Sequence, residues 1–284
     1  MKKVLICTDG SPYSEECCQF AAWLAKRVDV HLHAVYVSDL RQFELSVVAD
    51  LSGSMGIQPY QGMLTQIQDM EDQKAKLLKA GTLDFFNKQG LEDRVTFAHY
   101  KGLLVDRVLD LEREDPEIGM VMLGKRGENA NFATEHLGST MERVVRASEK
   151  PCLVTSRKFR EIKKIAFAYD GSPSCQKALK FLSTSPLFEG LDVHLVTVDE
   201  GRNEEEASER LSEASSQLQA SGLKLVTQVL TGIAENVIGE YVESEDIDLL
   251  VMGAYGHSRI RYLIIGSTTT DLIRRCHIPI LLFR

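Results

Sequence analysis

The sequence predicts an α/β protein made of two consecutive domains, each a doubly wound, five-stranded parallel sheet. Two observations predict this fold class. Short apolar segments alternate with helical segments, and the whole order of segments occurs twice within 284 residues. The repeat is clearest where Asp-Gly-Ser-Pro at 9–12 recurs at 170–173, an offset of 161 positions. A repeating unit of this length indicates fused domains rather than a solenoid.

In the first copy, five β-rich apolar segments predict strands, and the segments between them predict helices. Pro12 falls where a helix can begin, because the first turn has no use for its missing N–H. Apolar residues from Phe20 to Val28 then recur at helical spacing. The predicted strands are 3–8, 30–37, 94–99, 118–124 and 152–155, and the predicted helices after the first are 65–89, 103–114 and 139–148.

The second copy repeats this order. Its predicted strands are 164–169, 193–198, 223–230, 248–253 and 280–283. Strands joined by helical crossovers pair in parallel with right-handed connections, which predicts helices on both faces of each sheet. The predicted domains are residues 1–158 and 161–284, with a join in the polar stretch 156–160. The short last strands of the copies are expected to pair, giving an internal pseudo-dimer. Whether two chains also form a homodimer stays open.

The first copy is 31 residues longer, since the offset between matching segments falls from 161 to 130 between Val37 and Gly102. Most of the excess is predicted at 40–68, where three glycines and a proline indicate a loop. Two interpretations stay open: a surface excursion, or a lid or partner-docking arm beside the first copy's site.

Composition excludes several classes of function. The chain has 33 basic and 41 acidic residues, a net charge of −8, which argues against nucleic-acid or anionic-membrane binding. No apolar run approaches the ~18 residues of a membrane-spanning helix, and the N-terminal run is too short for a signal peptide. Six scattered cysteines without a CxxC pair suit the reducing cytoplasm and predict neither disulfides nor a metal site.

A candidate ligand site lies beyond the carboxyl ends of the second copy's strands, where open parallel sheets bind ligands. Asp170 ends the first of these strands, and a glycine-containing segment, 253–268, follows the fourth. Gly253 and Gly256 allow backbone conformations closed to other residues and close approach to a ligand. Between the glycines lie Arg259 and Arg261, with no acid.

The end of this segment also favours an anion. Gly266 and Ser267 open the last helix, whose free N–H groups and dipole attract negative charge. Ser267 and Thr268 add hydroxyl donors. The residues of the segment therefore predict a phosphate-binding loop.

The pattern G-x2-G-x9-G-[ST] after an apolar strand, with Asp-Gly-Ser after the first strand, resembles the universal stress protein family. The resemblance covers nearly the whole chain, in the family's tandem form. It implies a Rossmann-like fold of the adenine nucleotide alpha hydrolase type, and ATP, with or without Mg²⁺, as the ligand. It implies that Asp170 and Val198 contact the adenine and that the backbone of Gly253 and Gly256 borders the ribose and phosphates. It implies that Gly266, Ser267 and Thr268 cradle the phosphates. Arg259 joins this candidate set through the positive charge of its loop.

The first copy departs from this pattern. Gly124 and Gly127 are followed by ten residues, one more than in the second copy, before Gly138 and Ser139. The loop 128–137 carries two glutamates and no Lys or Arg, so its charge opposes a polyphosphate, and Lys125 and Arg126 could partly offset it. Ser139 and Glu142 also predict a capping box that uses the helix-start donors. A nucleotide is therefore expected in the second copy and not in the first, whose weaker set is Asp9, Val37, Gly124, Gly127, Gly138 and Ser139.

Some of these residues have simpler explanations. Asp9 and Asp170 could merely shape a turn and start a helix. The strand histidines are expected to be packing or surface residues rather than ligands, and the cysteines are expected to be structural. The G-x4-G-K match at 119–125 is rejected as a P-loop because its variable residues form a predicted strand.

Three functions stay open. The first is an ATP-binding regulatory protein of the stress response, and the second is a scaffold that binds no nucleotide. The third is a slow ATPase, for which His257 is the only candidate base, since phosphoryl transfer needs a positioned base and usually a metal. The residues predict no catalytic group.

Overall fold

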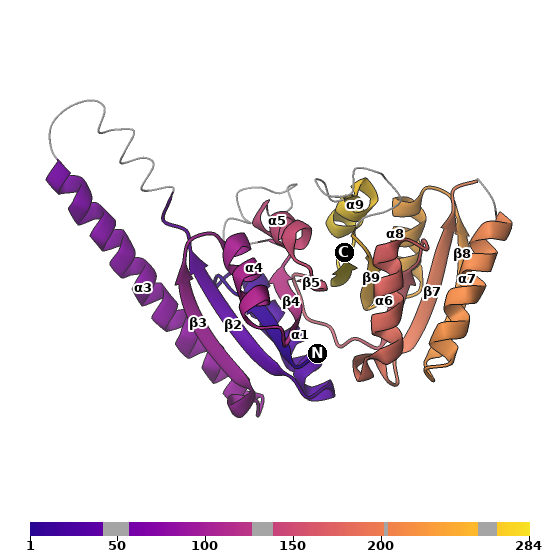
Figure 1. The fold of residues 1–284 in the computed structure, drawn as a ribbon, viewed down its shortest axis with the longest axis horizontal. Coiled ribbons are helices and arrows are strands. Elements are labelled where there is room, and N and C mark those ends of the chain that lie inside the picture. The colour runs from indigo at the N-terminus through magenta and orange to yellow at the C-terminus, as the bar shows by residue number, and fades with distance from the viewer. Residues whose placement is uncertain (42–56, 127–138, 202–203, 255–265) are drawn as a thin grey trace.

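The computed structural model describes residues 1–41, 57–126, 139–201, 204–254 and 266–284, drawn as the coloured ribbon of Figure 1. The first half contains strands β1 (Lys3–Cys7), β2 (His31–Ser38), β3 (Val95–Lys101), β4 (Ile118–Gly124) and β5 (Cys152–Thr155), with helices α1 (Pro12–Arg27), α3 (Ile57–Lys88), η2 (Glu92–Arg94), α4 (Leu104–Glu114) and α5 (Ser139–Ala147). The second contains β6 (Lys164–Ala168), β7 (Asp192–Asp199), β8 (Lys224–Thr231), β9 (Leu249–Gly253) and β10 (Ile280–Phe283), with α6 (Pro173–Thr184), η4 (Pro186–Phe188), α7 (Glu204–Gln219), α8 (Ala234–Ser244) and α9 (Ser267–Arg275).

All ten strands form one sheet in the order β3-β2-β1-β4-β5-β10-β9-β6-β7-β8. Neighbouring strands are parallel within each half, which confirms the predicted doubly wound topology. At the seam, β5 and β10 pair antiparallel from Ile280–Val154 to Leu282–Cys152. The expected pairing of the short last strands is therefore confirmed, and it joins the two halves edge to edge (Figure 1).

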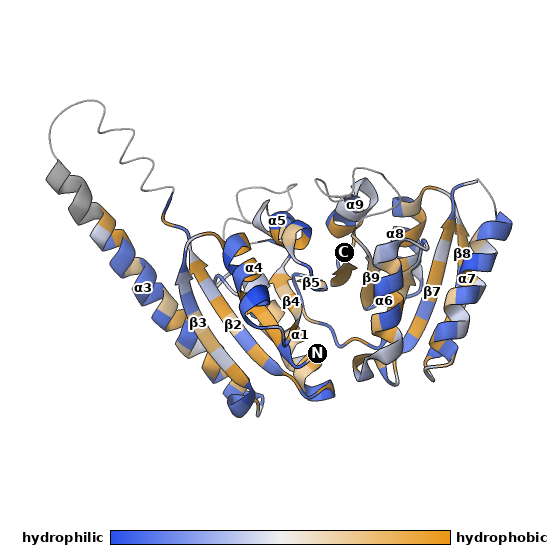
Figure 2. Cartoon of the chain, in the orientation of Figure 1, coloured by the Kyte–Doolittle hydropathy of each residue, from blue (hydrophilic) through white to orange (hydrophobic). Residues whose placement is uncertain are grey.

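Two hydrophobic cores cover the two faces of this sheet, and each extends through both halves. One packs α1, α3, α6 and α7 against the sheet and includes Phe20, Phe86, Phe167 and Phe188. The other packs α4, α5, α8 and α9 on the opposite face. Figure 2 shows the apolar residues concentrated on the strands and on the sheet-facing sides of the helices. Each face is thus closed by residues from both copies.

Both helices that follow the Asp-Gly-Ser-Pro motif begin as predicted. Ser11 and Ser172 are the N-caps of α1 and α6, and a proline occupies the first helical position in each. The Ser172 hydroxyl accepts a hydrogen bond from the Cys175 amide at 3.3 Å. The glycine before each cap has a φ near +80°, a conformation that residues with a Cβ adopt at a cost. The motif is therefore a strand-to-helix turn in both halves.

Two cations cap helices across the seam. The Lys125 ammonium donates to the carbonyls of Arg274 and Cys276 at 3.1 and 3.0 Å, at the end of α9. The Arg284 guanidinium donates to the Ala147 carbonyl at 3.0 Å, at the end of α5. These carbonyls have no partner within their own helix, and cations are favoured there. Burial lowers the pKa of Lys125 to about 8.

The loop predicted at 40–68 is partly wrong. Residues 57–68 belong to α3, which starts eight residues before the predicted helix start at 65. Pro59 is compatible with helix there because it lies in the first turn, where backbone N–H groups have no helical acceptor. α3 has 32 residues and its counterpart α7 has 16, so about half of the excess is helix. The remaining part, 42–56, lies outside the described residues.

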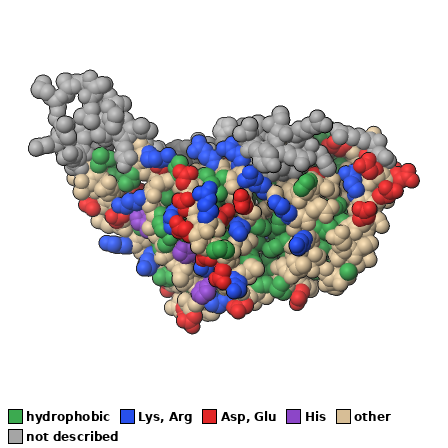
Figure 3. All heavy atoms as spheres, in the orientation of Figure 1, with side chains coloured by type: hydrophobic (Ala, Val, Ile, Leu, Met, Phe, Trp, Pro, Cys, Tyr) green, Lys and Arg blue, Asp and Glu red, His purple; other side chains and the backbone are tan. Residues whose placement is uncertain are grey.

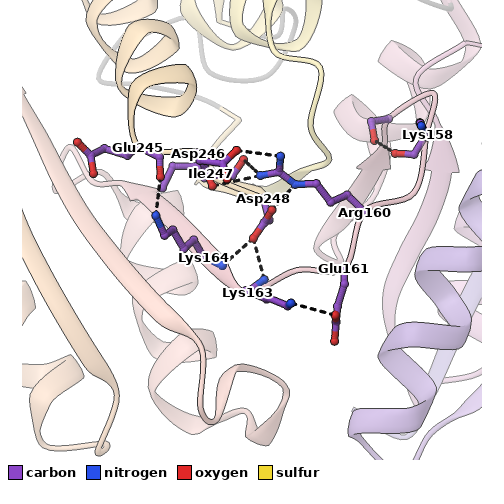
Figure 4. A network of polar contacts seen from close by, with 10 residues as sticks. Lys158, Arg160, Glu161, Lys163, Lys164, Glu245, Asp246, Ile247 and Asp248 are labelled. Carbon is purple, nitrogen blue, oxygen red and sulfur yellow. Dashed lines mark hydrogen bonds and ion pairs between the residues drawn. The ribbon is translucent and has the colours of Figure 1, made fainter.

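The linker between the halves is held at both ends. Arg160 donates to the carboxylates of Asp246, at 2.9 Å, and Asp248 (Figure 4). Asp248 also accepts the backbone N–H groups of Lys163 and Lys164, both at 2.9 Å. On the other side, the Phe159 ring meets the Phe20 ring of α1 edge-on, with centroids 5.0 Å apart. The linker is therefore part of the folded unit.

Within the described ranges, no helix combines the length and the apolar character needed to cross a membrane.

We expect Asp248→Ala to cost about 2–3 kcal/mol of unfolding free energy, because it leaves two N–H groups and a guanidinium without their buried acceptor. Chemical denaturation of the full chain measures this loss. Asp246→Asn is the matched control: its side chain is 78% exposed, so it should cost less than ~1 kcal/mol. Equal losses for the two variants would contradict the role of Asp248.

Candidate functional site

The candidate site lies at the topological switch point of the second half. β6 has β9 on one side and β7 on the other, so the chain leaves β6 in one direction and returns on the opposite side. Ligands of open parallel sheets bind outside the carboxyl ends of strands at such a point. Asp170 lies two residues beyond β6 and Gly253 ends β9. Two of the predicted site residues thus flank the switch point.

Asp170 shapes the turn that leads into α6. Its carboxylate accepts a hydrogen bond from the Ser172 amide at 2.8 Å, and Asp9 does the same with Ser11 at 2.9 Å. The turn-forming explanation of these aspartates therefore holds in both halves. In the second half, Arg210 of α7 also donates to the Asp170 carbonyl at 3.1 Å. A cation thus lies beside the turn that follows β6.

Gly253 has a packing role that the sequence analysis did not foresee. A Cβ at this position would lie 2.4 Å from the Ser174 hydroxyl and 3.3 Å from the Cys175 sulfur. Gly124 is equivalent, since its Cβ would lie 2.7 Å from the Cβ of Tyr13. Each glycine lets the first turn of α6 or α1 pack directly on the end of the neighbouring strand. The need for glycine here follows from helix packing as well as from any ligand.

The start of α9 is tied to the end of β9. Gly266 is the N-cap, and its amide donates to the Ala254 carbonyl at 3.3 Å. The Thr269 hydroxyl donates to the same carbonyl at 3.3 Å. The Ser267 side chain is exposed and that of Thr268 is half-buried. The first turn of α9 therefore sits at the carboxyl edge with its helix-start N–H groups beside the switch point.

A carboxylate that the sequence analysis missed also reaches this turn. The Thr268 hydroxyl donates to Glu235, in the first turn of α8, at 3.2 Å. The loop 255–265 contains no acid, but the fold brings one from another helix. The repeat did not point to Glu235, because the matching position of the first half, at the offset of 130, is the apolar residue Val105. Its charge opposes an anion at the start of α9.

The two halves differ in what covers the Asp-Gly turn. A Cβ on Gly171 would meet the Arg210 side chain at 3.3 Å, whereas a Cβ on Gly10 would meet the Leu78 side chain at 2.7 Å. The first half thus presents an apolar group where the second presents a cation. The Lys125 ammonium donates to the carbonyls at the end of α9. Whether Lys125 and Arg126 partly offset the acidic loop 128–137 stays a prediction, because that loop lies outside the described residues.

The remaining predicted residues divide into two groups. Val198 and Val37 are half-buried on β7 and β2, near the carboxyl ends of these strands. α5 starts at Ser139, where the predicted helix starts, and the capping box expected between Ser139 and Glu142 stays a prediction. Several predicted residues fall outside the described part of the chain, namely Gly256, His257, Arg259, Arg261, Gly127 and Gly138.

The strand histidines are packing or surface residues and the cysteines are packed, as expected: His31 is exposed, His33 is half-buried and His194 is buried. The His194 imidazole lies 2.8 Å from the Tyr241 hydroxyl, and burial lowers its pKa. All six cysteines are buried and free. Burial raises the pKa of Cys175 to about 12 and that of Cys276 to about 11, so both stay protonated thiols at neutral pH. Among the residues with described positions, no group of His, Cys, Asp and Glu could hold a metal ion.

Comparisons with known proteins agree on one family. The model of the universal stress protein family matches residues 1–156 and 161–284. A universal stress protein of Synechocystis sp. is 43% identical over 291 residues, covering 100% of both chains. A second, from Mycobacterium tuberculosis, is 28% identical over 134 residues, 43% of this chain and 48% of that one. The crystal structure of a universal stress protein from Archaeoglobus fulgidus has the same fold, with a TM-score of 0.71 over 99% of this chain and 96% of that chain at 19% identity.

We expect Gly253→Ala to destabilise the protein by about 1–3 kcal/mol, because the added methyl group overlaps the Ser174 hydroxyl. Thermal unfolding of the unliganded protein measures the loss. Gly81→Ala on α3 is the control, because a Cβ added there would meet no atom within 4 Å beyond its own stretch of helix. Alanine in an exposed helix should raise the free energy of unfolding by up to ~1 kcal/mol. A neutral Gly253→Ala variant would contradict the packing role.

Proposed function

The chain belongs to the universal stress protein family as two fused copies of its domain, and on this premise we propose that it is an adenine-nucleotide-binding regulatory protein of the stress response. ATP, with or without Mg²⁺, binds the second domain, residues 161–284. The first domain, residues 1–158, binds no nucleotide and serves as its structural partner. A reducing, cytoplasmic location fits the six free, buried cysteines.

One observation carries this proposal: an unbroken series of contacts joins the Asp-Gly-Ser turn to the start of α9. Arg210 contacts the backbone of Asp170, and the first turn of α6 packs on Gly253. The next residue, Ala254, accepts the amide of Gly266. The three elements that would meet an adenine nucleotide are thus fixed relative to one another at the switch point, as a preformed site requires.

The charge around this framework differs between the domains in the direction that the proposal needs. The second domain has Arg210 at its Asp-Gly turn, and the loop 255–265 contributes Arg259 and Arg261 with no acid. In the first domain, the corresponding turn is covered by Leu78 and the loop 128–137 contains two glutamates. Phosphates are favoured near cations and disfavoured near carboxylates. These differences support one nucleotide site in the chain.

A specific observation favours a second candidate function, a scaffold that binds no nucleotide. Glu235 already accepts a hydrogen bond from Thr268 in the first turn of α9. This bond uses a hydroxyl that the nucleotide site needs and adds a negative charge beside it. A slow ATPase is the third candidate and rests on His257 alone. It requires turnover of labelled ATP that His257→Ala abolishes.

Purified protein should release an adenine nucleotide on denaturation, or bind added ATP, as measured by ultraviolet absorbance with chromatography and by titration calorimetry. Asp170→Ala or Gly266→Val should weaken binding at least about tenfold, which is ~1.4 kcal/mol. Asp9→Ala and Gly138→Val are the controls. The aspartate pair is closely matched, because each carboxylate accepts one turn N–H, at 2.8 and 2.9 Å. Absence of binding, or equal loss from both domains, would overturn the proposal.

Glu235→Gln separates the nucleotide function from the scaffold. It keeps an acceptor for Thr268 and removes the charge, so ATP affinity should rise about 3- to 10-fold, a gain of roughly 1 kcal/mol from one partly screened charge. Glu243→Gln, exposed in the last turn of α8, should leave the affinity unchanged. If the protein is a scaffold, calorimetry should detect no ATP binding in either variant.

A further inference from the structure

A shallow groove of about 290 Å³ lies between α6 and the seam. Its walls come from both halves and include Pro151, Lys177, Lys180, Phe181, Phe283 and Arg284. In Figure 3, hydrophobic side chains are exposed beside Lys and Arg side chains where Figure 1 shows α6 and the C-terminus. The pairing of β5 with β10 brings the two sets of lining residues together.

The equivalent groove on α1 is filled by the linker. By the offset of 161, Glu16 and Phe20 of α1 match Lys177 and Phe181 of α6. Phe159 of the linker places its ring edge-on to Phe20, with centroids 5.0 Å apart. Its backbone N–H donates to the Glu16 carboxylate at 2.5 Å. An aromatic anchor and one backbone hydrogen bond thus hold an extended segment against α1.

The floor of the groove on α6 is already ordered. The ring of Phe181 contacts those of Phe188 and Phe283, with centroids 5.8 and 5.4 Å away. Arg284 is fixed by its hydrogen bond to the Ala147 carbonyl at 3.0 Å. Binding of a ligand therefore loses little side-chain entropy in this groove, which favours its affinity.

The two helices carry opposite charges at one matching position. On α1 this position holds the carboxylate of Glu16, which accepts the backbone N–H of Phe159. The groove on α6 has Lys177 in place of that carboxylate, together with Lys180 and Arg284 against the single acid Glu149. An occupant of this groove must therefore present oxygen acceptors and negative charge.

We propose that the groove on α6 binds an extended acidic segment of a partner protein, with one aromatic side chain seated against Phe181 and Phe283. Carboxylates on either side of the aromatic residue meet Lys177, Lys180 and Arg284. This mode copies the aromatic contact by which the linker lies on α1, with Lys177 in the place of Glu16. It is independent of nucleotide binding in the second domain.

Three synthetic heptapeptides test the proposal by fluorescence anisotropy with the full chain. The probe is Ser-Glu-Glu-Phe-Glu-Glu-Ile, which is the linker sequence at 156–162 with its three basic residues replaced by Glu. The natural basic sequence and the acidic peptide with Phe replaced by Ala are the controls. We expect the probe to bind at least about tenfold more tightly than either control, and more weakly as salt rises from about 50 to about 300 mM.

Variants locate the binding. Lys177→Glu with Lys180→Glu should weaken the probe at least about tenfold, whereas Lys76→Glu with Lys79→Glu, two exposed lysines of α3, should not. Thermal unfolding checks that both double variants are folded. Equal binding of the basic peptide, equal loss in the α3 variant, or no binding of the probe at about 1 mM would overturn the proposal. Complete displacement by inorganic phosphate at constant ionic strength would overturn it too, because it would show a simple anion site.

Discussion

The antiparallel pairing of β5 with β10 is the interaction on which the rest of the structure depends. It joins only a few residues, from Ile280–Val154 to Leu282–Cys152, yet it removes an exposed edge from each half and turns two sheets into one. Both cores then extend across the seam, and Lys125 and Arg284 satisfy helix ends in the opposite half. The stability of each domain is therefore partly supplied by the other.

The sequence predicts the fold well where an apolar segment has sharp polar borders. The strands expected at 118–124, 152–155 and 280–283 have those bounds in the structure, because flanking Pro, Gly or charged residues mark their ends. The start of α3 was predicted too late because the residues before position 65 have no sharp border between loop and helix. Pro59 normally signals a break, but a proline in the first turn of a helix is tolerated. Local pattern alone does not separate these two situations.

The candidate site is less predictable because half of it comes from tertiary contacts. The glycine spacing and the Asp-Gly-Ser motif lead to the carboxyl ends of β6 and β9 in the second half, since each motif follows one of these strands. Arg210 and Glu235 carry no motif and arrive from α7 and α8. Gly253 was explained by a ligand, while its contact with Ser174 gives it a role in packing. The nucleotide-binding roles assigned to all the site residues, Gly256 and Arg259 among them, stay predictions.

The single linker has a consequence for how such a protein can change over generations. In a dimer of identical chains, every substitution appears at two symmetric places, so a change that helps one site is imposed on the other. Here both copies belong to one chain, so a substitution in one copy leaves the matching position of the other copy unchanged. Leu78 opposite Arg210 and Val105 opposite Glu235 are differences of a kind that a symmetric pair cannot hold. In a fused chain, the two halves can therefore accept substitutions independently of each other.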